Sequence, residues 1–352
     1  MNVQIYDAKG EHIYASWAKG EFNDLTYQLE RIGGMISASF RVPCEYTEPY
    51  PWAKRRNQVQ VYSDGGVCVF DGYIHDLSRY WNEKDSGIKV DVVGWVAKLA
   101  RDYVSASLAN EKASTYLAAH VLVGMFADYV STGELDTDDY LIPGRLDFSP
   151  QKTKRAAIDE IYPYNLDTHE WGVWEKEFYW RKVADSLSYR TTVYGGCTGE
   201  IRQGCGEQAQ KVRLVHRDMA GAWQAVVATD ADADDGEYIL ITLDDNMSTA
   251  QATRMAEAEL ERAKKAGTNA PIKITRLWGK SGEMDVAEAK PGLILAVAGI
   301  VPGEASIAEA DIDNDLDTWC IESIKYSAET GVADAAPGRL PYNLPTVIGG
   351  TR

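Results

Sequence analysis

One stretch, Val59 to Val104, constrains the fold of this chain more than any other part of its sequence. Within it, three short segments alternate apolar and polar residues or are rich in Val and Phe, which is the pattern of half-buried strands. These segments are residues 59–62, 67–74 and 88–92. Glycine-containing and polar turns separate them, and at Gly94 the apolar spacing changes to that of a helix. We therefore predict a β-barrel or sheet whose three antiparallel strands lead into a helix across its mouth.

The rest of the chain also favours strands, with three further helices. The other strands are expected around residues 3–5, 14–17, 33–43, 171–180 with a turn at 175–176, 212–216, 223–229, 238–243, 272–277, 293–297 and 320–326. A long helix is expected over 113–131, and a second from Ser149-Pro150 to the residue before Pro163. The third begins with a capping box, Ser248 followed by Gln251.

Chain length and the N-terminal sequence bound the class of protein. At 352 residues the chain is long enough for two or three domains, each with its own core. We find no run of about 18 apolar residues that could span a membrane. Residues 1–7 lack the basic and then apolar segments of a secretory signal peptide, so we expect synthesis in a cytoplasm.

The formal net charge of −17 argues against a protein that reads nucleic acid, because such proteins present a basic face to the phosphates. It is compatible with a surface that DNA passes without adhering, since carboxylates repel phosphates. One basic cluster, Lys54-Arg55-Arg56, precedes the strand at 59–62. It could hold a phosphate group, or it could be a solvent-exposed segment that leads into that strand.

No pattern of catalytic residues is visible. His169 and His216 have no Ser or Cys at the spacing of a nucleophilic triad, and there is no zinc, Cys/His or paired-carboxylate pattern. We therefore expect neither catalysis nor a cofactor. Cys197 and Cys205 lie in a glycine-rich segment, where a metal or redox loop and two reduced thiols both remain open. The aromatic residues of 171–180 could bind a sugar or pack within a sheet.

Two acidic stretches resemble calcium loops, because oxygen ligands at alternating positions suit a hard cation. In residues 230–236 the glycine comes one residue late and no acid stands at the twelfth position. The closer candidate ligands are Asp311, Asp313, Asp315 and Asp317, with Glu322 at the twelfth position. Leu316 replaces the glycine, however, and a solvated acidic loop is the alternative. From Pro291 to Ile324 there are seven acids and no Lys or Arg, so water, salt or a basic partner must relieve the repulsion.

The order of segments over residues 33–104 resembles the first barrel of phage tail hub proteins. The segments that carry the resemblance are GGMISASFRVP, NQVQVY, VFDGYIHDLSRYW and IKVDVVGWVAKLARDYV. The matching positions are Gly34, Phe40, Pro43, Gly72, Ile74, Gly94, Trp95 and Leu99. Later, SPQKTKRAAIDEIY is similar to the helix between the barrels of that family, and STAQATRMAEAELERAKK to the helix before the second barrel. KPGLILAV is similar to a strand of the second barrel, although Leu293 stands where that pattern often has an acid.

This resemblance implies an α+β, mainly β fold with two tail-tube-like β-barrels. The first barrel with its closing helix would be residues 1–110, an α+β insertion 111–245, and the second barrel with an extended tail 246–352. A weak internal repeat, residues 59–77 against 293–326, also favours two similar barrels. Because generic hairpins look alike, coincidence is the alternative.

The resemblance further implies a structural protein of the virion, located at the tail tip or baseplate. In that family a homotrimer presents six barrels to a sixfold tail. It joins the tail tube or distal tail protein to the central fibre or spike, and DNA or the tape-measure protein passes through. Three chains of charge −17 would carry −51, which fits an acidic channel. The alternative is a carbohydrate- or receptor-binding tail module that uses the aromatic residues of 171–180.

Overall fold

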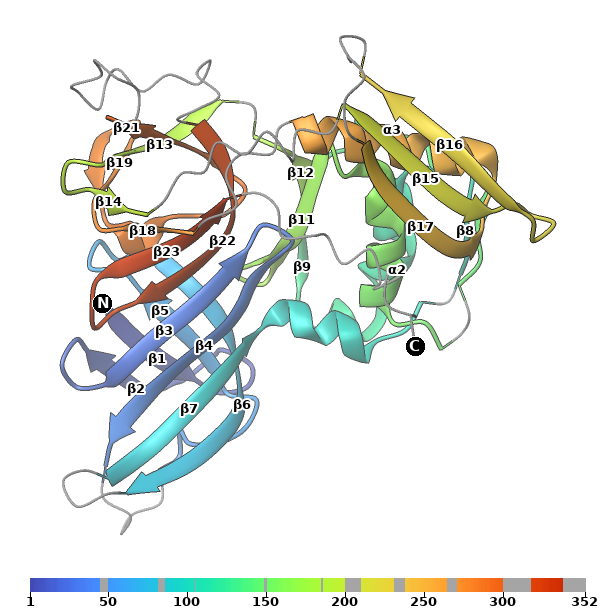
Figure 1. The fold of residues 1–352 in the computed structure, drawn as a ribbon. Coiled ribbons are helices and arrows are strands. Elements are labelled where there is room, and N and C mark those ends of the chain that lie inside the picture. Colours follow the sequence, from blue (N-terminus) through green and yellow to red (C-terminus); the bar gives the residue numbers. More distant parts are fainter. Residues whose placement is uncertain are drawn as a thin grey trace.

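A computed structural model describes residues 1–44, 50–81, 86–104, 106–148, 151–184, 186–199, 210–230, 238–264, 271–299 and 318–337. Strands dominate, and helices are few, the longest being α3 (Thr249–Lys264). Figure 1 shows two curled sheets on the left and a mixed region of helices and strands on the right. The predicted α+β, mainly β fold is therefore confirmed. No helix of the described residues is long and apolar enough to cross a membrane.

The first curled sheet contains the first seven strands of the chain. They are β1 (Asn2–Tyr6), β2 (Ile13–Ala18), β3 (Asn23–Glu30), β4 (Gly33–Pro43), β5 (Gln58–Tyr62), β6 (Cys68–Trp81) and β7 (Ser86–Gly94). All pairs are antiparallel, in the spatial order β2-β1-β5-β6-β7-β4-β3. Alternate side chains such as Val59 and Val61 are fully buried, so the period-two pattern marks the inner face.

The chain leaves this sheet at Gly94, where two backbone segments meet closely. A Cβ atom at this position would lie 1.7 Å from the carbonyl oxygen of Met35, so only glycine fits. The helix expected after it is a short 3-10 helix, η1 (Trp95–Arg101), which buries Trp95, Val96 and Leu99.

The second curled sheet combines strands from two distant parts of the sequence. They are β13 (Leu187–Thr192), β14 (Cys197–Thr198), β18 (Ile272–Ile274), β19 (Leu277–Gly279), β20 (Gly282–Met284), β21 (Ile294–Ala298), β22 (Thr318–Ser327) and β23 (Val332–Pro337). The strands pair in the order β13-β21-β22-β23-β18. Strand β19 also pairs with β13, where Trp278 lies opposite Arg190. Strands β13 and β14 thus come from residues 111–245, the range that the sequence analysis assigned to the insertion, and they pair with strands from residues 246–352.

The central region has its own hydrophobic core. Its elements are β8 (Leu108–Ala109), α1 (Ala113–Tyr116), η2 (Leu117–Val121), η3 (Gly124–Phe126), β9 (Ser131–Leu135), β10 (Arg145–Leu146), α2 (Lys154–Ile161), η4 (Tyr162–Asn165), β11 (His169–Trp174), β12 (Glu177–Lys182), β15 (Lys211–Arg217), β16 (Trp223–Thr229), β17 (Tyr238–Asn246) and α3 (Thr249–Lys264). Helix α3 packs on the sheet of β15, β16 and β17 (Figure 1).

The single long helix predicted for 113–131 is wrong. The chain forms three short helical pieces, α1, η2 and η3, and strand β9 begins at Ser131. The apolar spacing does bury Leu117, Val121 and Phe126, but Val123 is extended and Gly124 has a φ of 68°. Both conformations interrupt a helix, because they break its i to i−4 hydrogen bonds.

The predicted capping box of α3 is confirmed. The backbone N–H of Gln251 donates to Ser248 Oγ at 3.2 Å, and that of Ser248 donates to Gln251 Oε1 at 2.8 Å. The hairpin expected at 171–180 is also present, with its turn at Glu175 and Lys176, both of which have positive φ.

The two curled sheets are continuous with each other. Strand β22 pairs with β3 from Ser323–Glu30 to Ser327–Thr26. One cluster of buried apolar side chains runs through both sheets, with Phe70 on one side and Leu295 on the other. Strand β11 of the central region is parallel to β4 at Gly33 and Gly34.

Candidate functional site

The three parts of the fold meet at Arg31, in the turn between β3 and β4. Its Nη1 donates to Glu322 Oε1 of β22 at 2.7 Å, and its Nε donates to Glu170 Oε2 of β11 at 3.2 Å. Arg181 of β12 also contacts Glu170, with 2.7 Å between Nη2 and Oε1. The side chains of Arg31 and Glu170 are almost fully buried. These ion pairs therefore fix the two curled sheets and the central region against one another.

The charges of this junction depend on each other. Burial raises the pKa of Glu170, and the guanidinium groups of Arg31 and Arg181 oppose that rise. Burial also acts against the charge of Arg31, but Glu322 and Glu170 keep its pKa well above the ordinary value. Gly292, with a φ of 83°, lies so close that a Cβ atom would be 2.3 Å from Glu170 Oε2. The arrangement is a buried structural junction between sheets.

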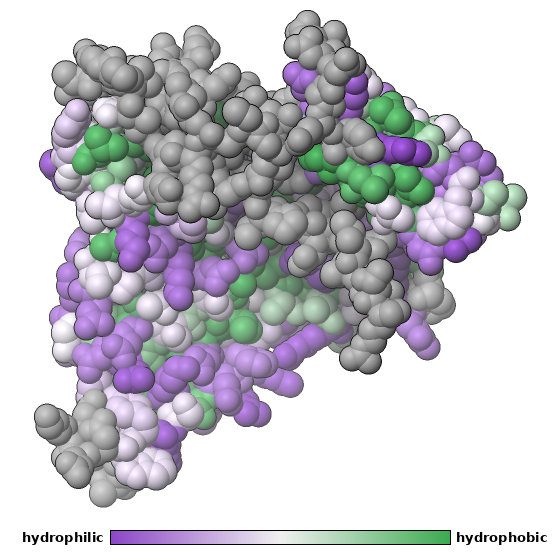
Figure 2. Space-filling model, viewed as in Figure 1, coloured by the Kyte–Doolittle hydropathy of each residue, from purple (hydrophilic) through white to green (hydrophobic). Residues whose placement is uncertain are grey.

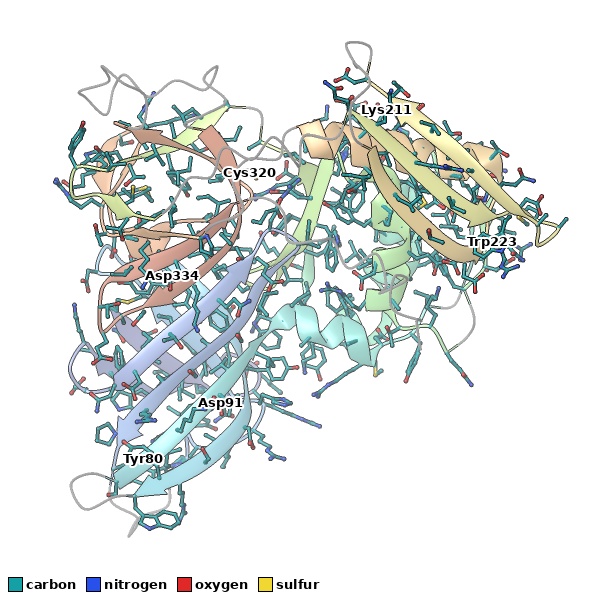
Figure 3. All side chains as sticks on the ribbon, in the orientation of Figure 1. Tyr80, Asp91, Lys211, Trp223, Cys320 and Asp334 are labelled. Carbon is teal, nitrogen blue, oxygen red and sulfur yellow. The ribbon has the colours of Figure 1, made fainter. Side chains whose placement is uncertain are left out.

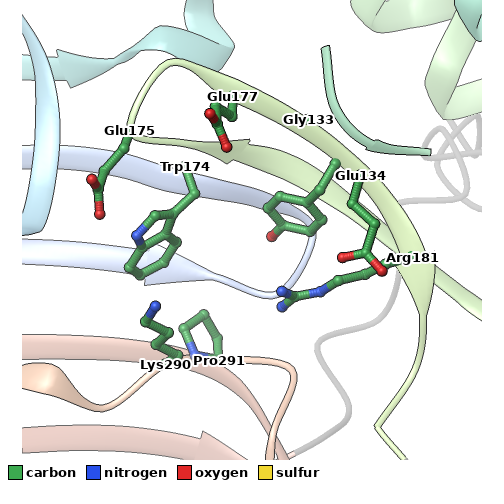
Figure 4. Close-up of a pocket in the computed structure, with 9 residues that line it drawn as sticks. Gly133, Glu134, Trp174, Glu175, Glu177, Arg181, Lys290 and Pro291 are labelled. Atoms are coloured by element: carbon green, nitrogen blue, oxygen red, sulfur yellow. The ribbon is translucent and has the colours of Figure 1, made fainter. Parts of the chain in front are cut away.

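A cavity of about 330 Å³ lies beside the junction (Figure 4). Its lining residues are Gly133, Glu134, Trp174, Glu175, Glu177, Tyr179, Arg181, Lys290 and Pro291. Lys290 Nζ lies 4.8 Å from the ring centroid of Trp174, and Arg181 is already paired with Glu170. The lining contains no Ser, Cys or His, so it holds no Ser/His or Cys/His pair of the kind found in a nucleophilic triad.

Three of the aromatic residues considered for sugar binding are packed inside the central region, while Trp174 lines the cavity. Trp171 and Trp180 are opposite each other on β11 and β12, and both are fully buried, as is Phe178. The guanidinium of Arg155 stacks on Trp171 at 4.6 Å. These rings therefore have no exposed face for a sugar, and they stabilise the hairpin against the helices.

The calcium candidates are only partly within the described residues. Glu322 lies in β22, and its Oε1 accepts a hydrogen bond from Arg31. The other candidates of that stretch, Asp311, Asp313, Asp315 and Asp317, lie outside the described residues, as do residues 231–236 of the first stretch. Cys197 is a buried free thiol. Cys205 lies outside the described residues.

One group of possible metal ligands in the structure was not predicted from the sequence. Among the described residues, the ligand atoms of Asp7, Glu11 and His12 all lie within 4.8 Å of one another, in the exposed turn after β1. Asp7 Oδ1 accepts hydrogen bonds from the backbone N–H groups of Lys9 and Glu11. These hydrogen bonds stabilise the turn, and the turn brings the three side chains together.

The visible face of the first curled sheet is mostly hydrophilic (Figure 2), and two exposed features stand out from it, a strand edge and a tryptophan. Among the described strands, β2 pairs with β1 alone, so its second side is an edge. The hairpin of β6 and β7 extends past β5 (Figure 1) and carries Trp81, which is 76% exposed, at its end. Figure 3 labels Tyr80 and Asp91 on the same two strands.

Comparison with known proteins gives structural neighbours but no sequence relatives. No family model matches the sequence, and no curated protein matches it. The 43 kDa tail protein of prophage MuSo2 from Shewanella oneidensis aligns over 96% of this chain and 98% of its own, with TM-score 0.65 and 14% identity. The tail protein from Neisseria meningitidis MC58 aligns over 95% and 94%, with TM-score 0.61 and 12% identity.

A third neighbour gives the same result. Prophage tail protein gp18 from Listeria monocytogenes EGD-e aligns over 96% of this chain and 95% of its own, with TM-score 0.59 and 9% identity. In all three cases the match includes both curled sheets and the central region, because it spans nearly the whole of each chain. At these identities the likeness concerns the fold. The chain therefore has the fold of phage tail proteins, as its resemblance to the tail hub family implied.

Proposed function

We propose that the protein is a structural component of a phage tail, the hub that joins the tail tube or distal tail protein to the central fibre or spike. The observation that carries this proposal is the end-to-end match of the fold to three phage tail proteins. A match of this kind covers the arrangement of all parts of the chain, and not merely a common β-sheet motif.

The architecture supports a trimer with pseudo-sixfold symmetry. Each chain contributes two curled sheets, so three chains supply six, the number needed to face a sixfold tail. The buried junction at Arg31 holds the two sheets of one chain in a fixed relation. The edge of β2 and the exposed Trp81 are features through which neighbouring copies could pair.

The charge supports a channel through which DNA passes. Three chains would carry −51, and a carboxylate-rich wall would repel phosphates and keep DNA from adhering. The tape-measure protein would occupy the same channel before DNA does. The protein would thus reside at the tail tip or baseplate of the virion, after synthesis in the bacterial host cytoplasm.

A carbohydrate- or receptor-binding module is supported less well. The aromatic rings that suggested it, Trp171, Phe178 and Trp180, are buried. An enzyme also has less support, since the lining of the cavity beside the junction contains no Ser/His or Cys/His pair and the matched neighbours are tail proteins.

Two measurements test the proposal. Quantitative mass spectrometry of purified tails from the phage that encodes this chain should give three copies per tail. Sedimentation equilibrium of the purified protein should give a mass of about 117 kDa, three times the 38.9 kDa of one chain. Absence from purified tails, or six copies in each, would overturn the proposal.

A further inference from the structure

A basic surface stands out on this acidic chain, at the point where η1 leaves the first curled sheet. Arg56, which precedes β5, and Arg101, at the end of η1, are both exposed, and Lys98 of η1 is half-buried and close enough for both to act on its charge. Together with Met125 and Tyr129 we call these residues the basic-apolar patch. No carboxylate of a described residue forms an ion pair with its three cations, whereas neighbouring Arg55 is paired with Asp76.

Contacts with aromatic rings fix the centre of this patch. Lys98 Nζ lies 4.0 Å from the ring centroid of Tyr129 and 4.3 Å from that of Tyr73. Tyr129 stacks on Trp95 at 6.2 Å. The three positive charges are close enough to act on one another: burial, then Arg101 and Arg56, lower the pKa of Lys98. This concentration of like charge would be relieved by a bound anionic group.

Two further features describe the patch. Arg56 has a φ of 75°, a conformation that residues with a Cβ atom rarely adopt, and a hydrogen bond from its N–H to Ile74 O holds it there. Tyr129, which contacts Lys98, is 42% exposed, and Met125 of the nearby helix η3 is 60% exposed. An apolar rim of this kind favours a protein segment over DNA, which the net charge of −17 also repels.

The sequence contains a segment of complementary chemistry. Residues 300–317, which lie outside the described residues, carry six acids and no Lys or Arg. The acids are Glu304, Glu309, Asp311, Asp313, Asp315 and Asp317. Apolar residues alternate with them, among them Ile307, Ile312 and Leu316. The segment therefore matches the patch in both of its properties, opposite charge and apolar contact.

The two ends of the segment set how far it can reach from the second curled sheet. It connects β21 to β22 in the second curled sheet, while the patch lies at the helix that follows β7 (Figure 1). Eighteen residues anchored at both ends reach out roughly 30 Å, at about 3.3 Å for each of nine extended residues. In the proposed ring the second sheet of one copy lies beside the first sheet of the next.

We propose that the basic-apolar patch binds the acidic segment 300–317 of a neighbouring copy of this chain. The proposal rests on the trimer of the proposed function and adds the contact that orders its subunits. It also gives the acids at 311, 313 and 315 a partner other than calcium.

A peptide-binding assay tests recognition without requiring assembly. A fluorescein-labelled peptide of residues 300–317 should bind the full-length chain, as measured by fluorescence anisotropy at low salt. The double variant R56E/R101E should bind it at least tenfold more weakly. The control R213E/K280E, which changes two exposed cations elsewhere by the same charge, should bind within twofold of the unchanged chain.

Reversing the charge of the peptide as well distinguishes a misfolded variant from one that has lost only its complementary charge. A peptide with D311K, D313K and D315K should bind R56E/R101E more tightly than it binds the unchanged chain. Equal loss in both double variants, or no recovery with the reversed peptide, would overturn the proposal. So would a single-stranded DNA oligonucleotide that displaces the peptide at equal concentration.

A photo-crosslinking experiment then identifies the copy involved. The full-length chain with benzoylphenylalanine in place of Met125 is assembled from an equal mixture of ¹⁴N and ¹⁵N protein and irradiated. Crosslinked peptides that join position 125 to residues 300–317 should occur in mixed-isotope pairs. Pairs of one isotope alone would contradict binding between copies. A monomeric protein that still binds the peptide would refute the trimer and leave the recognition established.

Discussion

Removal of the Arg31 guanidinium should loosen the contact between the two curled sheets. In Arg31→Met, Glu170 keeps Arg181 as a partner, and Glu322 loses its hydrogen bond but is 16% exposed and can reach water. Breaking a buried ion pair from one side costs about 3–5 kcal/mol. Because Glu170 keeps an ion pair and Glu322 can be hydrated, we expect a cost at the lower end of that range, about 3 kcal/mol.

Hydrogen–deuterium exchange with mass spectrometry suits this prediction, because a chain of three parts need not unfold in one step. A loss of about 3 kcal/mol corresponds to roughly 100-fold faster exchange. We expect this change at the paired segment of β3 and β22, with little change in β15–β17. The matched control is Arg41→Met, whose partner Asp24 is about half exposed, and it should change exchange less than about fivefold. Equal effects of the two variants would refute the reasoning.

Three other perturbations have defined outcomes. Gly94→Ala should lower local stability by about 3 kcal/mol or more, measured by hydrogen exchange in β4 and β7, because the new Cβ atom meets the Met35 carbonyl oxygen; wild-type exchange would contradict the close approach. Ser248→Ala should cost about 1 kcal/mol in the same assay through the lost cap of α3, and no loss would show that the cap contributes nothing. Burial lowers the pKa of His169, so stability should fall as pH drops from about 6.5, where the unfolded chain binds the proton first. Thermal midpoints at several pH values should show a smaller fall in His169→Gln, and an equal fall would contradict this assignment.

Local patterns predicted most of the strands and the start of one helix. The segment 33–43 coincides with β4, because its alternation of buried and exposed residues ends at Pro43, which cannot donate to a further ladder bond. The capping box at Ser248 is a short-range signal, and it marks the start of α3. Strand β3 was missed although Leu25, Tyr27 and Leu29 alternate as a buried strand should.

Long-range features could not be predicted in the same way. Arg31 and Glu170 are 139 residues apart in the sequence, and Arg31 and Glu322 are 291 apart, so no spacing rule relates them. The parallel pairing of β13 with β21 likewise depends on how distant segments pack. The helix expected at 113–131 had the correct apolar spacing, but tertiary packing buried those side chains on three short pieces.

The arrangement of the subunits is the central claim, and a cryo-electron microscopy reconstruction of the assembled protein tests it most directly. We predict a threefold ring in which the first and second curled sheets alternate around a channel, related by about 60° of rotation under pseudo-sixfold symmetry. A ring of another symmetry, or one in which the second curled sheet of each chain faces away from the channel, would contradict the account.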